Sequence, residues 1–312
     1  MDAAKMTASL DHDLLVDRRR LKRHLTVWRV AAVGLAALAA FVVMRDSISD
    51  ALPGGGGHVA RLRVEGAITD DRKVTEALDS AARNSAVRAL IISIDSPGGT
   101  VAGGEALHAA IARFRSHKPV VAVMRGTAAS AAYMIAMPAE RVFARESTVT
   151  GSIGVIMQSF DVSELMGRLG VRPETLASAA LKGQPSPFQP LTEEGRAALR
   201  AVISDLHSQF VSMVAEGRRL PVEDVRILAD GRVYTGRQAV ALKLVDAIGG
   251  EEEARAWLES ARAIPATTPV RELETRDLSE RTFGFALRGI AKTVISEWLA
   301  IDGVRAVWQP GP

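Results

Sequence analysis

Ser130 is the residue of this chain whose type and surroundings most favour nucleophilic chemistry. It lies in the run RGTAASAAYMIAMPA, residues 125–139, where most neighbours are small. Small neighbours would let a substrate carbonyl reach the hydroxyl, whereas serine is also an ordinary first residue of a helix that packs tightly on a sheet. The run alone leaves both interpretations open.

A glycine-rich segment, IDSPGGTVAGG at residues 94–104, supplies a second chemical feature. Pro97 fixes its own φ, and the consecutive glycines that follow permit positive φ. A turn of this kind can aim backbone N–H groups at one point, and such groups at the start of a helix bind a negative oxygen. Taken by itself, the segment is equally well a plain strand-to-helix connection.

Strands and helices alternate around both motifs. The clearest predicted elements are strands at residues 59–68, 89–95 and 119–125, and helices at residues 71–84, 105–116 and 192–219. Such alternation, with continuous apolar strands, predicts a largely parallel α/β sheet covered on its faces. Since the carboxyl ends of parallel strands share one edge, where ligands bind, we expect the glycine-rich turn and Ser130 to meet there as an acyl-transfer site.

The serine needs a base, and the histidines are poorly placed to be one. The six are His12, His24 and His58 in the predicted tail and linker region, His117 in a loop, and His108 and His207 within helical patterns. No aspartate stands in an obvious orienting position, so nothing supports a Ser-His-Asp triad. Lys182 follows three apolar residues, and a lysine acts as a base when an apolar environment favours its neutral form. The alternative for such a lysine is a solvated surface charge.

An apolar run near the N-terminus predicts a membrane segment. Residues 25–44 would span about 30 Å as a helix, close to the hydrocarbon thickness of a bilayer, with Arg29 reaching the headgroups. A cleaved signal peptide and a buried core helix are the alternatives, although no A-x-A-like cleavage site follows the run. Five Lys and Arg residues at positions 18–23 predict a cytoplasmic N-terminus and an extracytoplasmic remainder.

Composition narrows the remaining possibilities. The chain has 312 residues, of which 47% are hydrophobic, so it can bury a sizeable core. It has no cysteine, which excludes disulfides and thiolate metal sites. A net charge of only +3 gives little reason to expect a nucleic-acid partner.

Five motifs in series resemble those of a known family. IDSPGG, GTAASAAY, TGSIGV, a lysine ahead of SPFQPLTEE, and ADGRVYTGRQA occur in this order within residues 59–255. They are similar to motifs of the signal peptide peptidase A family of membrane-anchored Ser/Lys proteases, in its short bacterial form. The resemblance implies an α/β fold with a crotonase- or Clp-protease-like core of parallel strands and helices, a helical C-terminal part and one N-terminal transmembrane helix.

The resemblance also implies a role for each candidate residue. Ser130 would be the nucleophile, Lys182 its general base, and Ser152 the residue that orients the lysine amine. The backbone N–H groups of Gly99 and Ala131 would form the oxyanion hole. Neither a metal nor another cofactor would be needed.

Further residues bear on substrate choice. Apolar pocket walls near Met134 and Ile135 would favour hydrophobic residues before the cut. The family's usual Gly-Gly after the nucleophile is Ala131-Ala132 here, and the first methyl would narrow the approach. Ala179 replaces the glycine of the usual Ser-Gly-x-x-Lys segment, which keeps the spacing and reduces backbone freedom.

The predicted organisation has five parts. They are a basic cytoplasmic tail (1–24), a transmembrane signal anchor (25–44), a glycine-rich linker (45–57), the Ser/Lys protease domain (58–265) and a tail with an amphipathic helix (266–312). That last helix would serve packing or oligomerisation, with a place on a membrane surface as the alternative.

We therefore expect a single-pass inner-membrane serine endopeptidase, active outside the cytoplasm, that degrades remnant signal peptides and similar hydrophobic peptides through an acyl-enzyme. In half-length members of the family the serine and lysine come from different subunits, so the resemblance also implies a ring-shaped homo-oligomer. The alternatives are a crotonase-like acyl-thioester enzyme and a membrane scaffold whose catalytic site has lapsed.

Overall fold

A computed structural model describes residues 28–29, 33–34, 57–273, 275 and 304–307. The predicted basic tail, most of the predicted membrane segment and the predicted C-terminal amphipathic helix lie outside these ranges. None of the helices within them is long and apolar enough to cross a membrane. The chain divides into two units, Met1–Gly56 and Gly57–Pro312, and the second holds every strand that the structure describes.

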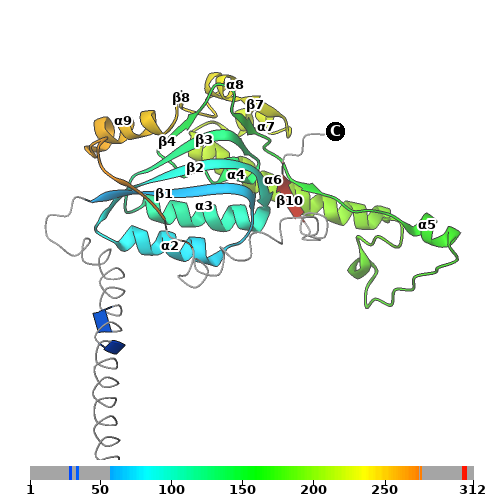
Figure 1. The fold of residues 1–312 in the computed structure, drawn as a ribbon. Helices are drawn as coiled ribbons and strands as arrows, with labels where there is room; N and C mark the ends of the chain where they lie inside the picture. Colours follow the sequence, from blue (N-terminus) through cyan, green and yellow to red (C-terminus); the bar gives the residue numbers. More distant parts are fainter. Residues whose placement is uncertain (1–27, 30–32, 35–56, 274, 276–303, 308–312) are drawn as a thin grey trace, which may run out of the picture. The chain divides into compact units, whose positions relative to one another are not determined.

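A mixed, mostly parallel sheet forms the centre of the second unit (Figure 1). Its parallel ladders join β1 (His58–Ile68), β2 (Val87–Thr100), β3 (Val120–Ala129), β4 (Arg141–Ala144), β5 (Val149–Gly151), β8 (Ala247–Ile248) and β9 (Val270–Glu272). Its antiparallel ladders add β6 (Ile156–Met157), β7 (Val233–Thr235) and β10 (Val304–Val307). The α/β core of largely parallel strands predicted from the sequence is thus confirmed, with antiparallel strands added to it.

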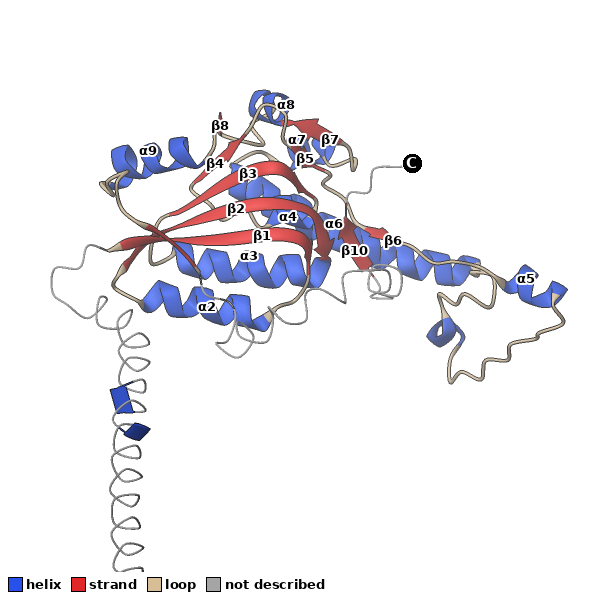
Figure 2. Ribbon diagram, in the orientation of Figure 1, coloured by secondary structure: helices blue, strands red, loops and turns tan. Residues whose placement is uncertain are grey.

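Helices cover both faces of the sheet (Figure 2). They are α2 (Arg72–Arg83), α3 (Val101–Arg115), α4 (Ala131–Met134), α5 (Ser163–Arg168), the 3-10 helix η1 (Ala180–Gly183), α6 (Glu193–Arg218), α7 (Val222–Leu228), α8 (Gly236–Ala241) and α9 (Glu251–Arg262). α2 and α3 pack on one face, and α9 packs on the other.

Alternate residues of the central strands enter two different hydrophobic clusters. In β2, Leu90 and Ile92 join the cluster that includes α2, α3 and α4, whereas Ala89 and Ile91 join the one that includes α9. All four residues are 0% exposed. Successive side chains of a strand point to opposite faces, so a strand covered on both faces needs an unbroken apolar run.

The glycine-rich segment differs from the predicted turn. β2 continues through Gly98 and Gly99 to Thr100, and α3 begins directly afterwards at Val101. Pairing explains the extension, because Gly99 lies opposite Ile68 of β1 on one edge and Ala306 of β10 on the other. The side chain of Thr100 then caps α3 by accepting a hydrogen bond from the Gly103 amide at 3.1 Å.

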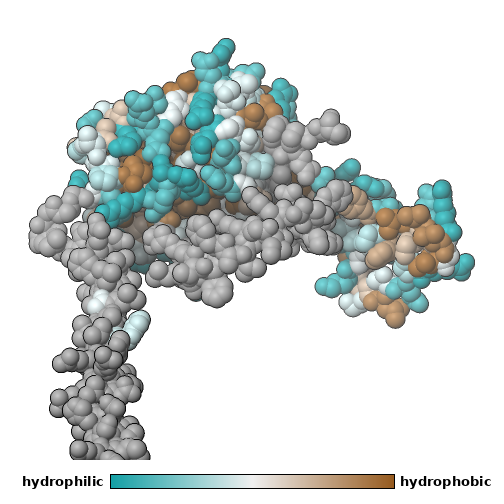
Figure 3. Space-filling model, in the orientation of Figure 1, coloured by the Kyte–Doolittle hydropathy of each residue, from teal (hydrophilic) through white to brown (hydrophobic). Residues whose placement is uncertain are grey.

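Residues 158–192, which we call the arm, leave the sheet after β6 and carry α5 and η1 (Figure 1). Large apolar side chains lie exposed on it, and Figure 3 shows them gathered there. They are Phe160, Leu165, Leu169, Val171, Leu176, Leu181 and Phe188. An exposed apolar concentration of this kind marks an interaction surface.

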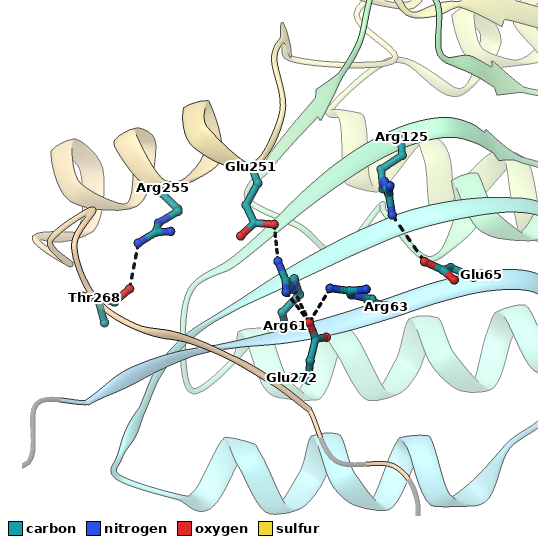
Figure 4. A network of polar contacts seen from close by, with 8 residues as sticks. All are labelled: Arg61, Arg63, Glu65, Arg125, Glu251, Arg255, Thr268 and Glu272. Carbon is teal, nitrogen blue, oxygen red and sulfur yellow. Dashed lines mark hydrogen bonds and ion pairs between the residues drawn. The ribbon is translucent and has the colours of Figure 1, made fainter. Parts of the chain in front are cut away.

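A network of ion pairs fastens the C-terminal elements to β1 (Figure 4). Arg61 pairs with Glu251 of α9 at 2.8 Å and also with Glu272 of β9. Arg63 pairs with the same Glu272 at 2.9 Å. Since β1 and β3 run in the same direction and these arginines lie in the first half of β1, the network lies away from the strand ends where Ser130 is found.

A second ion pair, largely buried, holds the end of α6. The Arg218 side chain is 7% exposed and donates to the two carboxylate oxygens of Asp246 at 2.8 and 2.9 Å. Asp246 also accepts from the Val142 amide at 2.7 Å. Burial acts to raise the pKa of the Asp246 carboxyl, but the hydrogen bonds and the charge of Arg218 outweigh it and hold that pKa below its ordinary value.

We predict that Asp246→Asn lowers the free energy of unfolding by about 3 kcal/mol at pH 7, because it leaves Arg218 buried without a counter-charge. The carboxyl pKa is lower in the folded chain, so its stabilisation is complete above about pH 4 and is lost as the pH falls through the folded value. Urea titrations of the two proteins between pH 7 and pH 3 should therefore converge at the acidic end. Asp79→Asn, which removes an exposed partner of Arg113, is the control and should cost under about 1 kcal/mol throughout.

Candidate active site

Ser130 lies at the junction of β3 and α4 in a backbone conformation that L-residues rarely adopt, with φ 58° and ψ −124°. Its amide donates to the Gly151 carbonyl at 2.9 Å, and its own carbonyl accepts from the Tyr133 and Met134 amides at 2.9 and 3.0 Å. The residue is 1% exposed. Backbone strain that surrounding hydrogen bonds enforce is typical of functional sites.

The Ser130 hydroxyl has no hydrogen-bond partner among the described residues. Buried polar atoms are nearly always paired, and an unpaired one costs about 1–3 kcal/mol. Together with the strained backbone, this unpaired hydroxyl distinguishes Ser130 from a helix-capping serine, since its side chain makes no capping bond either. No histidine partners it, in agreement with the absence of a triad signal in the sequence.

Gly99 occupies a position that no side chain could share. A Cβ there would lie 1.9 Å from the Ile68 carbonyl oxygen across the β1–β2 ladder. The preceding Gly98 has φ 112°, and its amide donates to the Ser96 hydroxyl at 3.1 Å. These contacts fix the path of the backbone whose N–H group was predicted to contribute to an oxyanion hole.

Ala131, the other predicted oxyanion-hole residue, begins α4 directly after Ser130 and is 0% exposed. α3 packs closely on it, because a Cβ on Gly104 would lie 3.0 Å from the Ala131 Cβ and 3.2 Å from the Met134 sulfur. Met134 and Ile135, the predicted pocket residues, are 1% and 0% exposed within the core. The small side chains around Ser130 therefore allow α3 and α4 to approach each other.

Ser152 lies one peptide away from the carbonyl that holds Ser130. It follows β5, has φ 49°, and donates its amide to the Arg232 carbonyl at 2.8 Å. The residue is 7% exposed. Ser130 and Ser152 both have positive φ. Ser130 is hydrogen-bonded to Gly151 and Ser152 follows it in the chain, so the structure brings these two predicted site residues together.

Lys182 lies elsewhere, on the arm. It is an exposed residue of η1, and its amide donates to the Ala179 carbonyl at 3.0 Å. Its amine is not a partner of the Ser130 hydroxyl within the chain. A single copy therefore brings together the candidate nucleophile and Ser152, and leaves the candidate base on a separate projection.

β10 is a neighbour of the site that sequence reasoning missed. Ala306 lies opposite Gly99 in an antiparallel ladder with β2, and Val304 lies opposite Met157 of β6. β1 pairs with one edge of β2 as far as Gly99. On the other edge, β3 pairs with β2 until Ala128 lies opposite Ser96, and β10 pairs with the part of that edge beyond this point. Four residues without a periodic pattern gave no signal by which this strand could have been found.

Comparisons with known proteins give the family of the chain. The sequence profile of peptidase family S49 matches residues 112–264, and that of Clp protease matches residues 62–156. A Synechocystis protein provisionally named as a protease is 39% identical over 201 residues, 64% of this chain and 72% of that protein.

Two further relatives are longer than the part they share with this chain. A protein of Enterococcus faecium provisionally named signal peptide peptidase SppA is 33% identical over 216 residues, 69% of this chain and 61% of the relative. The chloroplastic serine protease SPPA of Arabidopsis thaliana is 31% identical over 267 residues, 83% of this chain and 39% of the relative. The chain thus spans about three fifths or less of the length of these two.

The fold and the matching Clp-protease profile define a Clp-protease-like α/β protein, and the buried Ser130 at its strand ends is the candidate nucleophile. The chain belongs to peptidase family S49 and is a serine protease of that family. The family resemblance stated from the five motifs is thereby confirmed.

We predict that Ser130→Gly is more stable than Ser130→Ala by about 1 kcal/mol, because only glycine adopts positive φ without steric cost. Thermal denaturation of the two variants measures the difference directly. Ala109→Gly at an exposed position in the middle of α3 is the control, where glycine should instead cost about 1 kcal/mol relative to alanine. Equal stability of the two Ser130 variants would contradict the strained conformation.

Proposed function

We propose that the chain is a membrane-anchored endopeptidase in which Ser130 attacks the scissile carbonyl and Lys182 acts as general base. The observation that carries this proposal is the buried, strained Ser130 with an unpaired hydroxyl, beside Ser152 and at the ends of β2 and β3. Its substrates would be remnant signal peptides and similar hydrophobic peptides. Membership in family S49 supports a peptide substrate.

The reaction follows from these groups. Neutral Lys182 takes the hydroxyl proton as the Ser130 oxygen attacks, and the amides of Gly99 and Ala131 stabilise the tetrahedral oxyanion. The lysine then gives the proton to the leaving amine, which departs as the acyl-enzyme forms. Water attacks this ester while the same lysine accepts its proton, and the proton returns to Ser130 as the peptide acid leaves.

Lys182 would reach Ser130 from a second copy of the chain. Its exposure on the arm and the exposed apolar residues around it support an arm that packs on a neighbouring protomer. Ser152, which follows the Gly151 carbonyl that holds Ser130, would then accept a hydrogen bond from the incoming amine. Head-to-tail repetition of one such contact closes into a ring, which is the predicted assembly.

An extended peptide substrate is supported by β10. Val304–Val307 lies antiparallel to Gly98–Thr100, as a peptide bound by strand addition would lie. A substrate in this register would pass along the Gly99 backbone with its main chain paired. Hydrophobic peptides suit such an edge because they gain affinity from main-chain hydrogen bonds and from burial of alternate side chains.

The location of the enzyme remains our proposal from the sequence. Residues 25–44 would anchor the chain as a single span, with the basic tail cytoplasmic and the protease domain outside the cytoplasm. Neither a metal nor an organic cofactor has a part in the mechanism.

We predict that Ser130→Ala and Lys182→Ala each lower kcat/KM on a fluorogenic signal-peptide-like substrate by at least about 10³-fold. Each variant lacks one member of the nucleophile–base pair, and neither member is effective without the other. Lys243→Ala, a lysine that follows α8, should leave the activity unchanged. Full activity in either site variant would overturn the dyad, and an inactive wild-type chain would favour a lapsed site.

A mixing experiment tests the shared site. When the inactive Ser130→Ala and Lys182→Ala chains are dissociated and reassembled 1:1, activity should return to about a quarter of wild type, because a quarter of the contacts then join an intact serine to an intact lysine. Either variant reassembled alone is the control. No recovery, with assembly shown by size measurement, would mean that the dyad forms within one copy.

A further inference from the structure

β2 and β3 lose their common register immediately before the active-site residues. Ile94 lies opposite Met124, but Ser96 lies opposite Ala128, so two steps along β2 match four steps along β3. The extra length forms a bulge, residues 125–127, opposite Asp95. A bulge re-aims the strand that follows it and leaves local backbone groups without ladder partners.

The Asp95 side chain closes this bulge from the β2 side. Its carboxylate oxygen Oδ1 accepts a hydrogen bond from the Thr127 amide at 3.0 Å. The same oxygen lies over Gly126, where a Cβ would come within 3.0 Å of it. The carboxylate therefore supplies the partner that the interrupted ladder denies to the Thr127 amide, and the glycine makes room for it.

Two buried threonines hold the carbonyls of the same stretch from the other side. The hydroxyl of Thr148 donates to the Arg125 carbonyl at 2.6 Å, and that of Thr150 donates to the Ala128 carbonyl at 2.7 Å. The Arg125 side chain points away to Glu65 at 3.5 Å on the exposed face, so it contributes little to the bulge (Figure 4). Asp95 is thus the side chain that ties the bulge to β2.

We propose that Asp95 is a positioning residue for catalysis, which rests on the proposed role of Ser130 as nucleophile. Gly99 lies four residues after Asp95 on β2, and Ser130 lies three residues after Thr127 on β3. The Asp95–Thr127 hydrogen bond therefore fixes the position of Ser130 along β3 relative to the Gly99 amide on β2. Asp95 does not take part in proton transfer, and it acts through the path of the backbone alone.

The test compares Asp95→Ala with Asp95→Asn in the full-length chain. Alanine leaves the Thr127 amide without its acceptor, whereas the asparagine side-chain oxygen still accepts the bond. We expect kcat to fall by about 10–100-fold in Asp95→Ala with KM within about threefold, because a small misplacement of reacting groups is costly. Asp95→Asn should retain kcat within about threefold of wild type. The rate at which a fluorophosphonate probe labels Ser130 should follow kcat in both variants.

Asp71→Ala is the matched control. Asp71 makes the same type of bond, from a carboxylate to the Lys73 amide at 2.9 Å, at the start of α2. Its loss should cost about 1 kcal/mol of stability with no change in labelling rate. Assays well below the melting temperature of every variant separate this structural cost from a catalytic one.

The outcomes separate this inference from the function on which it rests. If Asp95→Ala labels and turns over as fast as wild type, or if Asp95→Asn is as impaired as alanine, the positioning role is wrong while Ser130 remains the nucleophile. If the wild-type chain is labelled at another residue, or Ser130→Ala keeps full activity, the proposed function itself fails.

Discussion

The hydrogen bond from the Ser130 amide to the Gly151 carbonyl is the contact on which the site depends. A buried serine at φ 58° would relax toward a common conformation unless its amide were held, and the carbonyl that holds it comes from β5, one peptide before Ser152. This single bond therefore joins the strained candidate nucleophile to the segment that carries Ser152. The free energy that maintains the strain comes from the packing of β5 and α4, not from Ser130 itself.

The candidate site also requires glycine at two positions where the backbone passes close to other atoms. Gly99 passes so close to β1 that a methyl group would collide with the Ile68 carbonyl, and Gly126 leaves room for the Asp95 carboxylate. Both residues lie near strand ends, where backbone rather than side chains does the positioning. The main chain thus shapes the candidate site, and the alanines around Ser130 serve close packing between α3 and α4.

Much of the fold could be predicted from local patterns. The apolar run of β2 and the amphipathic patterns of α2 and α6 identified those elements because burial dictates their periodicity. The extension of β2 through Gly99 could not be predicted in this way, since it depends on pairing with β1 and with the distant β10. Motifs predicted Ser130 and Ser152 as site residues, and the structure shows that both lie next to Gly151. The contact of Asp95 with Thr127 was missed, because it arises from a register shift between two strands that no single segment displays.

The position of β10 has a consequence for measurements of peptide affinity. A ligand that pairs with Gly98–Thr100 needs the same edge of β2 that Val304–Val307 covers, so it must displace part of its own enzyme. Because β10 belongs to the same chain, its effective concentration at this edge does not fall when the protein is diluted. An observed dissociation constant then equals the intrinsic one divided by the fraction of time in which the edge stands uncovered. Chains that share the same catalytic residues but differ near their C-termini would differ in apparent affinity for one and the same peptide.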